Sequence, residues 1–255
     1  MNCGLWGRVD VSKRVFEFWT DFTHARGSGI ELSEGTVRRT PRPDAQTYYW
    51  KLHTHATYDA DHRMTQETRD RLSELWVLTK AGSADPMDLI GVDERRDGPD
   101  CMVSTRLAEA IAEMAGEAVE FMQVPRIWSV TEQKELTEPK YHYMNVIARH
   151  DSWDDSQTCI VESHDRKTGR PLGMYRIERS KHIVKDFDLP NFPIWRDSRT
   201  LHMMCTEVMK DLLESFDING LRFRPVDPIG VATAGDWMAP RLRNAKGTSA
   251  NRQIH

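Results

Sequence analysis

The residues that come closest to a metal site in type and spacing are histidines and aspartates between positions 53 and 62. His53 and His55 stand two residues apart, and Asp59, Asp61 and His62 follow shortly after. Side chains at i and i+2 of a strand point to the same side, so the two imidazoles could share a metal ion. A metal-dependent hydrolase using His53 and His55 is therefore one interpretation. Polar residues of an edge strand or loop give the same pattern, and we predict no metal ligand here.

Motifs that would support catalysis are missing from the sequence. It has one His-x-Thr element, His55-Ala56-Thr57, whereas two-histidine phosphodiesterases need one for the base and one for the acid. It has no Gly-x-Ser-x-Gly elbow, no His-Glu-x-x-His pair and no phosphate-binding glycine loop. Four cysteines stand far apart, with none in a Cys-x-x-Cys pair: Cys3, Cys101, Cys159 and Cys205. We expect free thiols in a reducing cytosol, no catalytic residue and no cofactor.

Two acidic patterns could instead recognise a protein partner. The segment Asp151-Ser152-Trp153-Asp154-Asp155 sets an aromatic side chain among three carboxylates, in an expected exposed turn after a strand. An aromatic anchor with steering charges suits a basic partner. Glu109, Glu113 and Glu117 stand four residues apart, which places them on one face of an expected helix. Solvated loops and helix faces show the same two patterns.

The composition is that of a folded, polar-surfaced protein that can position such residues. The chain has 255 residues, 39% hydrophobic and 29% charged, with a net charge of -4 and a mean hydropathy of -0.62. No apolar run approaches the roughly 20 residues that span a bilayer, and Met1 to Arg8 does not resemble a signal peptide. We therefore expect a cytoplasmic protein without a membrane partner. The acidic excess, within residues 46–189, disfavours nucleic-acid binding.

Helical periodicity is clearest in two segments. Ser104 is the expected N-cap of a helix over 104–118, and Thr206 that of a helix over 206–217. A third helix is predicted over Gln66–Lys80. The large apolar residues of these regions expected to be buried are Leu107, Ile111, Val208, Leu212, Phe216 and, on the following strand, Phe223.

The remaining segments are predicted from turn residues and β-forming residues. Ser12 could cap a short helix, and residues 27–44 are typical of a loop. Strands are expected at Gln46–Leu52, Val119–Val124, Tyr141–Arg149, Thr158–Val161, Met174–Glu178, His182–Asp186 and Leu221–Val226. The segment 141–149 is apolar on both faces, which favours a central strand. We predict an α+β fold, with a mixed or antiparallel sheet and packed amphipathic helices.

An ordered series of these segments carries a family resemblance. It begins with Ser104–Ile111 and Val119–Pro125, and continues through Tyr141–Val146, Asp151–Asp155 and Phe192-Pro193-Ile194-Trp195-Arg196. It closes with Cys205–Leu212 and Ile218-Asn219-Gly220-Leu221-Arg222-Phe223-Arg224-Pro225-Val226. The series resembles the immunity protein eleven family of bacterial polymorphic-toxin systems. The resemblance covers about residues 46–226, and its final helix, turn and strand are the most specific part.

The resemblance implies a protein that binds and neutralises a cognate antibacterial toxin in the cytoplasm, without catalysis, during bacterial competition. A nuclease effector is the expected toxin, because an acidic protein can enter the basic cleft of a nuclease. The residues expected to bind it are Asp151, Trp153, Asp154, Asp155, Glu109, Glu113 and Glu117. Two alternatives remain open, the hydrolase using His53 and His55 and an adaptor protein of a secretion system.

The resemblance and the composition together predict a division of the chain. Residues 1–45 form an N-terminal extension and residues 46–100 an N-terminal α/β subdomain. Residues 101–226 form the α+β core of the family, and residues 227–255 a C-terminal extension with a flexible end. The charged connector Asp93–Asp100 marks the boundary before the core.

Overall fold

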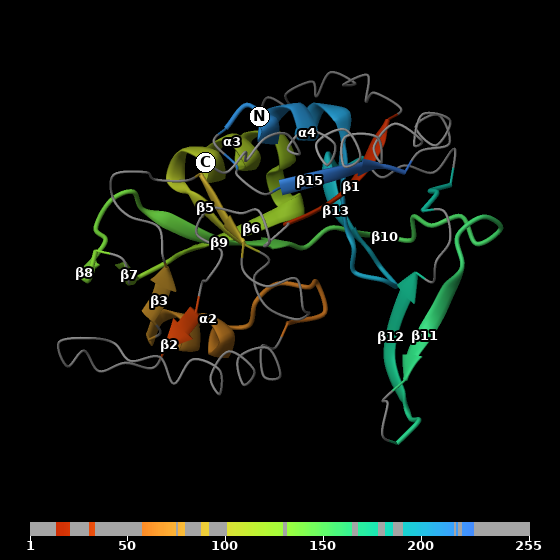
Figure 1. Cartoon of the computed structure of the whole chain (residues 1–255), viewed down its shortest axis with the longest axis horizontal. Helices are drawn as coiled ribbons and strands as arrows, with labels where there is room; N and C mark the ends of the chain where they lie inside the picture. Colours follow the sequence, from red (N-terminus) through yellow and green to blue (C-terminus); the bar gives the residue numbers. More distant parts are fainter. Residues whose placement is uncertain are drawn as a thin grey trace, which may run out of the picture.

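In the computed structural model, strands from distant parts of the chain pair into several sheets (Figure 1). The residues that it describes are 14–20, 31–33, 58–74, 76–79, 88–91, 101–129, 132–164, 168–177, 182–185, 191–216, 218 and 221–226. Helices and sheets occur together in these residues, which confirms the predicted α+β class. Within this part of the chain, no helix is long and apolar enough to cross a membrane.

A five-stranded sheet brings the start of the chain between two of its last strands. Its order is β10-β13-β14-β1-β15. The strands are β10 (Arg149–His150), β13 (Ile194–Asp197), β14 (Met203–Thr206), β1 (Val15–Thr20) and β15 (Leu221–Pro225). β1 pairs antiparallel with both of its neighbours. The predicted helix after Ser12 is therefore wrong, because the four consecutive residues Val15–Phe18 are all buried, on the two faces of a strand.

A four-stranded sheet carries the predicted central strand. Its order is β4-β5-β9-β6, formed by β4 (Leu89–Gly91), β5 (Cys101–Ser104), β9 (Tyr141–Val146) and β6 (Val119–Gln123). β9 pairs with β5 on one side and β6 on the other, and most of its residues are buried. The apolar residues on both of its faces are explained by this central position.

Two capped helices lie together on one side of these strands (Figure 1). They are α3 (Thr105–Ala115), continued by the 3-10 turn Gly116–Ala118, and α4 (Glu207–Glu214). The Ser104 side chain accepts a hydrogen bond from the Leu107 N–H, and the Thr206 side chain accepts one from the Met209 N–H. Both predicted N-caps are confirmed, because each hydroxyl satisfies an amide of the first turn.

The buried face of α4 differs from the predicted one by a single residue. Met209 and Leu213 are buried, whereas Val208 is 39% exposed. Leu212 and Phe216, like Phe223 on β15, are only partly buried against the core. A shift of one residue rotates the inward direction by about 100°, from the 3.6-residue period. The expected burial of Leu107 and Ile111 on α3 is confirmed.

Substitutions on neighbouring residues of α4 test this orientation. Met209→Ala is expected to lower the free energy of unfolding by about 2–5 kcal/mol, because it leaves a cavity in the core. Val208→Ala shortens a side chain on the exposed side of the helix and should change the free energy by less than about 0.5 kcal/mol. Urea unfolding of both variants measures the difference. A larger loss in Val208→Ala than in Met209→Ala would contradict the orientation.

The remaining elements form a second region and a hairpin. α2 (Gln66–Glu74) ends before the predicted Lys80, because Trp76–Thr79 forms β3 instead. β3 belongs to a four-stranded sheet of order β2-β3-β7-β8. Its other strands are β2 (Glu31–Ser33), β7 (Ile127–Ser129) and β8 (Lys134–Glu135). β2 thus lies in the segment predicted to be a loop. The hairpin of β11 (Ile160–His164) and β12 (Pro171–Ile177) projects from the rest in Figure 1.

Two predicted strands have other outcomes. In the segment His182–Asp186, the described residues form one isolated bridge, between Val184 and Trp153. The predicted strand Gln46–Leu52 lies outside the described residues.

One hydrophobic core joins Val15 on β1 to Leu107 on α3 and Val226 after β15. The division at residues 45, 100 and 226 stays a prediction.

Candidate functional site

Trp153, the expected toxin anchor, is a core residue. Its side chain is 0% exposed, and its indole N–H donates a hydrogen bond of 2.8 Å to the Thr200 hydroxyl. The ring meets His182 and His202 edge to face, with centroid distances of 5.5 and 5.9 Å. The expectation of an exposed aromatic in this loop is therefore wrong. A fully covered indole with a satisfied N–H contributes to folding stability.

Basic side chains pair with the outer acids of the loop 151–155. Lys185 Nζ lies 2.8 Å from one carboxylate oxygen of Asp151, and Arg199 lies 2.8 Å from the other. Arg199 also donates a hydrogen bond of 2.7 Å to Asp155. Partial burial raises the pKa of Asp151, but the Lys185 hydrogen bond and the Arg199 charge outweigh it and lower that pKa. The loop is thus less negative toward a partner than its sequence indicates.

Asp154 closes the turn of the same loop. Its carboxylate accepts hydrogen bonds from the Ser156 N–H, the Ser156 hydroxyl and the Gln157 side-chain amide. The side-chain hydrogen bonds from Ser156 and Gln157 are the main cause that lowers the pKa of Asp154. This carboxylate therefore has a local structural role in the protein.

The three glutamates of the second predicted surface are placed differently. Glu109 and Glu113 lie on α3, and Glu117 lies in the 3-10 turn that follows. All three are exposed, and none forms an ion pair with another described residue. We call them the α3 glutamate edge. Burial lowers the pKa of the nearby His142, and the charge of Glu109 opposes this shift. The edge presents negative charge directly to solvent.

Beneath the loop, a buried carboxylate gathers three basic side chains from distant segments. Glu17 on β1 has a side chain only 7% exposed. Its Oε2 accepts a hydrogen bond of 2.9 Å from Arg224 Nε and lies 2.9 Å from His182 Nδ1. Its Oε1 lies 2.6 Å from His202 Nδ1. We call these four residues the Glu17 cluster, and its two histidines are the rings that cover Trp153.

The Glu17 cluster also offers a donor set for a metal. Ligand atoms of Glu17, His182 and His202 all lie within 4.8 Å of one another. Arg224 Nη2, however, lies 2.8 Å from His182 Nδ1 and also contacts the Glu17 carboxylate. The guanidinium group already supplies the positive charge that a metal ion would bring. These residues therefore fit an ion-pair cluster better than a cation site.

Sequence reasoning did not find the Glu17 cluster. Its members stand far apart in the chain, and the five-stranded sheet brings Glu17 and Arg224 opposite each other in register. The sequence feature that points to a buried charge here is the single carboxylate of Glu17 within the apolar run Val15–Trp19. Of the metal candidates in the sequence, His53 and His55 lie outside the described residues. Asp59 accepts hydrogen bonds from the amides of Asp61 and Arg63, which closes a turn.

Comparison with protein-family models gives one decisive match. Residues 33–227 match the model of the immunity protein family Imm11. The chain belongs to the Imm11 family. The search of curated proteins gives no match. In this Imm11 protein the matched segment includes the acidic loop, the α3 glutamate edge and the final α4–β15 unit. The family predicted from the sequence is confirmed.

Proposed function

We propose that this protein neutralises a cognate antibacterial toxin by binding it in the cytoplasm, without catalysing a reaction. The observation that carries the proposal is membership of the Imm11 immunity family over residues 33–227. The partner we propose is a nuclease toxin domain. Nuclease active sites bind phosphates through basic residues, and an acidic protein surface complements them.

We propose the α3 glutamate edge as the main toxin-binding surface. Glu109, Glu113 and Glu117 are exposed and form no ion pair among the described residues. Asp151 and Asp155 are a secondary candidate, since Arg199 pairs with both. Unpaired carboxylates keep their long-range field, which speeds encounter with a basic partner. Trp153 and Asp154 are better explained by their roles within the fold.

The experiment uses the nuclease toxin domain that we expect the gene upstream of this protein to encode. The purified protein should inhibit its nuclease activity at one-to-one stoichiometry, with a dissociation constant in the nanomolar range, or about -12 kcal/mol. The Glu109→Gln, Glu113→Gln, Glu117→Gln triple variant should associate more slowly, with a weaker dependence on salt. Stopped-flow or surface plasmon resonance measurements at several salt concentrations give both quantities.

A second triple variant controls for net charge. Glu67, Asp70 and Glu74 lie exposed on α2, and changing them to Gln, Asn and Gln removes the same charge. This control should bind the toxin at the wild-type rate. Equal slowing in both triple variants would reject the α3 glutamate edge as the binding surface. Failure of the wild-type protein to inhibit the toxin would reject the proposed function itself.

A further inference from the structure

Two large apolar side chains are exposed to solvent where α4 begins. Phe192, just before β13, is 40% exposed, and Val208, in the first turn of α4, is 39% exposed. We call these two residues the apolar patch. Among the described residues, the other exposed large apolar side chain is Tyr175, on β12. Single exposed apolar residues are common, whereas exposed apolar residues that lie together mark surfaces for a partner.

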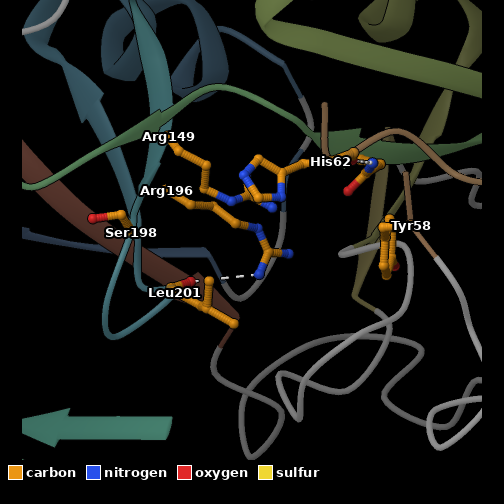
Figure 2. A pocket seen from close by; sticks show the side chains of 7 residues that line it. Tyr58, His62, Arg149, Arg196, Ser198 and Leu201 are labelled. Carbon is orange, nitrogen blue, oxygen red and sulfur yellow. Dashed lines mark hydrogen bonds between the residues drawn. The ribbon is translucent and has the colours of Figure 1, made fainter. Parts of the chain in front are cut away.

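The hairpin of β13 and β14 fixes Phe192 beside α4. The two strands pair antiparallel, and the N–H of Thr206, the N-cap of α4, donates a hydrogen bond of 3.0 Å to the Pro193 carbonyl oxygen. Phe192 therefore lies next to the first turn of the helix. At the other end of the hairpin, Arg196 donates a hydrogen bond of 3.4 Å to the Leu201 carbonyl oxygen, which Figure 2 shows. The backbone that carries Phe192 is thus fixed at both ends of the hairpin.

The rotation of α4 turns Val208 toward the same side as Phe192. α4 packs over β14 and β1. Its Lys210 lies over the rings of Phe16 on β1 and Phe223 on β15, at 5.4 and 5.5 Å, so this side of the helix faces β15. Val208 is two residues from Lys210, or about 200° around the helix. It therefore points away from β15, toward β13 and the segment that carries Phe192.

The side of α4 that carries Val208 also meets α3. The guanidinium group of Arg106, in the first turn of α3, lies 5.6 Å from the centre of the Phe216 ring, just after α4. Val208, Leu212 and Phe216 stand four residues apart, so they follow one side of the helix and of its end. The apolar patch and the α3 glutamate edge therefore belong to one layer of two packed helices.

The charges of this layer favour a basic partner over a second copy of the chain. The basic side chains of the two helices already have carboxylate partners. Arg106 pairs with Asp88, and Lys210 Nζ lies 2.5 Å from Glu214 and 3.8 Å from Asp211. The α3 glutamate edge forms no ion pair among the described residues. Two copies that met on this layer would bring like charges together, whereas a basic surface complements them.

We propose that the apolar patch is the anchor of the toxin interface, and that it receives an apolar side chain of a toxin surface whose basic residues face the α3 glutamate edge. This inference rests on the proposed function, which supplies the partner. Phe192 then takes the role of aromatic anchor for which the buried Trp153 is unsuited. Aromatic residues are enriched in the buried centre of interfaces, and charged residues are depleted there. The glutamates speed the approach of the toxin, and the patch slows its release.

Alanine variants of the full chain test the patch through the kinetics of toxin release. Surface plasmon resonance is measured with the purified toxin domain of the inhibition experiment. Phe192→Ala should raise the dissociation rate constant at least about thirtyfold, the effect of truncating an interface anchor. Val208→Ala should raise it by a smaller factor, because it removes less apolar surface. The salt dependence of association should stay as in wild type, in contrast to the triple glutamate variant.

Tyr175→Ala is the matched control on the β11–β12 hairpin. Tyr175 is as exposed as Phe192, at 40%, so this variant removes an aromatic ring of equal exposure far along the chain from α4. It should release the toxin at the wild-type rate. All three alanine variants should keep the thermal midpoint of wild type, because they change exposed side chains.

The outcomes separate this inference from the proposed function. If wild type binds the toxin and Phe192→Ala releases it as slowly as Tyr175→Ala, the apolar patch is not the anchor, and the proposed function stands. If wild type does not bind the toxin, both are rejected. Analytical ultracentrifugation of the free protein tests the other occupant. A dimer that Phe192→Ala converts to monomers would assign the patch to a second copy and overturn the inference.

Discussion

The Glu17→Gln variant is expected to lose about 3–5 kcal/mol of unfolding free energy, the cost of removing one partner from a buried ion pair. Glutamine keeps the size of the side chain but removes the charge that compensates Arg224 and faces His182 and His202. Glu17 also lies on β1 between β14 and β15, with Arg224 on β15 and His202 directly before β14. Urea unfolding followed by tryptophan fluorescence measures the loss.

An exposed glutamate provides the control for this variant. Glu113→Gln makes the same chemical change on the solvent side of α3, and its effect should stay within about 0.5 kcal/mol. If Glu17→Gln were as stable as Glu113→Gln, the Glu17 cluster would not contribute to the stability of the sheet.

Acid titration adds a second readout for Glu17. Burial raises the pKa of Glu17, but hydrogen bonds with His182 and His202 and the charge of Arg224 outweigh it, and the folded pKa lies well below the ordinary 4.5. The folded state therefore binds fewer protons than the unfolded state. The stability that Glu17 contributes is present above about pH 4.5 and is lost as the pH falls toward the folded pKa. Glu17→Gln should accordingly show a shallower loss of stability between pH 5 and pH 3.

The Trp153→Ala variant is expected to lose about 3–5 kcal/mol, as for other large aromatic residues of a core. It removes a fully buried ring, the hydrogen bond to Thr200 and the edge contacts with His182 and His202. The expected defect is in folding. Chemical unfolding together with toxin affinity, measured well below the thermal midpoint, separates this defect from a loss of binding.

A partly exposed tryptophan serves as comparison for Trp153. Trp128 on β7 is half-buried, so Trp128→Ala should cost less. Unchanged stability in Trp153→Ala with a large loss of toxin affinity would contradict the core position and restore the residue as an exposed anchor.

Local signals predicted α3 and α4 well, because the features that define them lie within a few residues. Ser104 and Thr206 each satisfy an amide three residues ahead, and the sequence shows this spacing directly. The face of α4 that packs against the core could not be predicted from local signals. Apolar residues occupy both stripes of this helix, Val208 and Leu212 on one and Met209 and Leu213 on the other. Docking against β14 and α3 selects between them, and no local pattern contains that choice.

The errors at β1 and Trp153 have a common physical origin in long-range contacts. β1 has apolar residues at positions that a short helix would also use, and its partners lie near the other end of the sequence. Trp153 follows a strand among acids, which is typical of an exposed turn. His182 and His202 cover it only because the sheet gathers them around Glu17. The prediction of the α+β class was correct despite these errors, because it depends on the presence of several helices and strands and not on any single one.

The position of β1 between β14 and β15 sets the timing of folding during synthesis. β1 ends at Thr20, whereas β14 begins at Met203 and β15 at Leu221. At roughly 5–20 residues per second, a ribosome makes both partners about 10–40 s after β1. The five-stranded sheet and the Glu17 cluster therefore close only after translation has passed β15. A nascent chain that stops before Leu221 leaves one edge of β1 open to other chains.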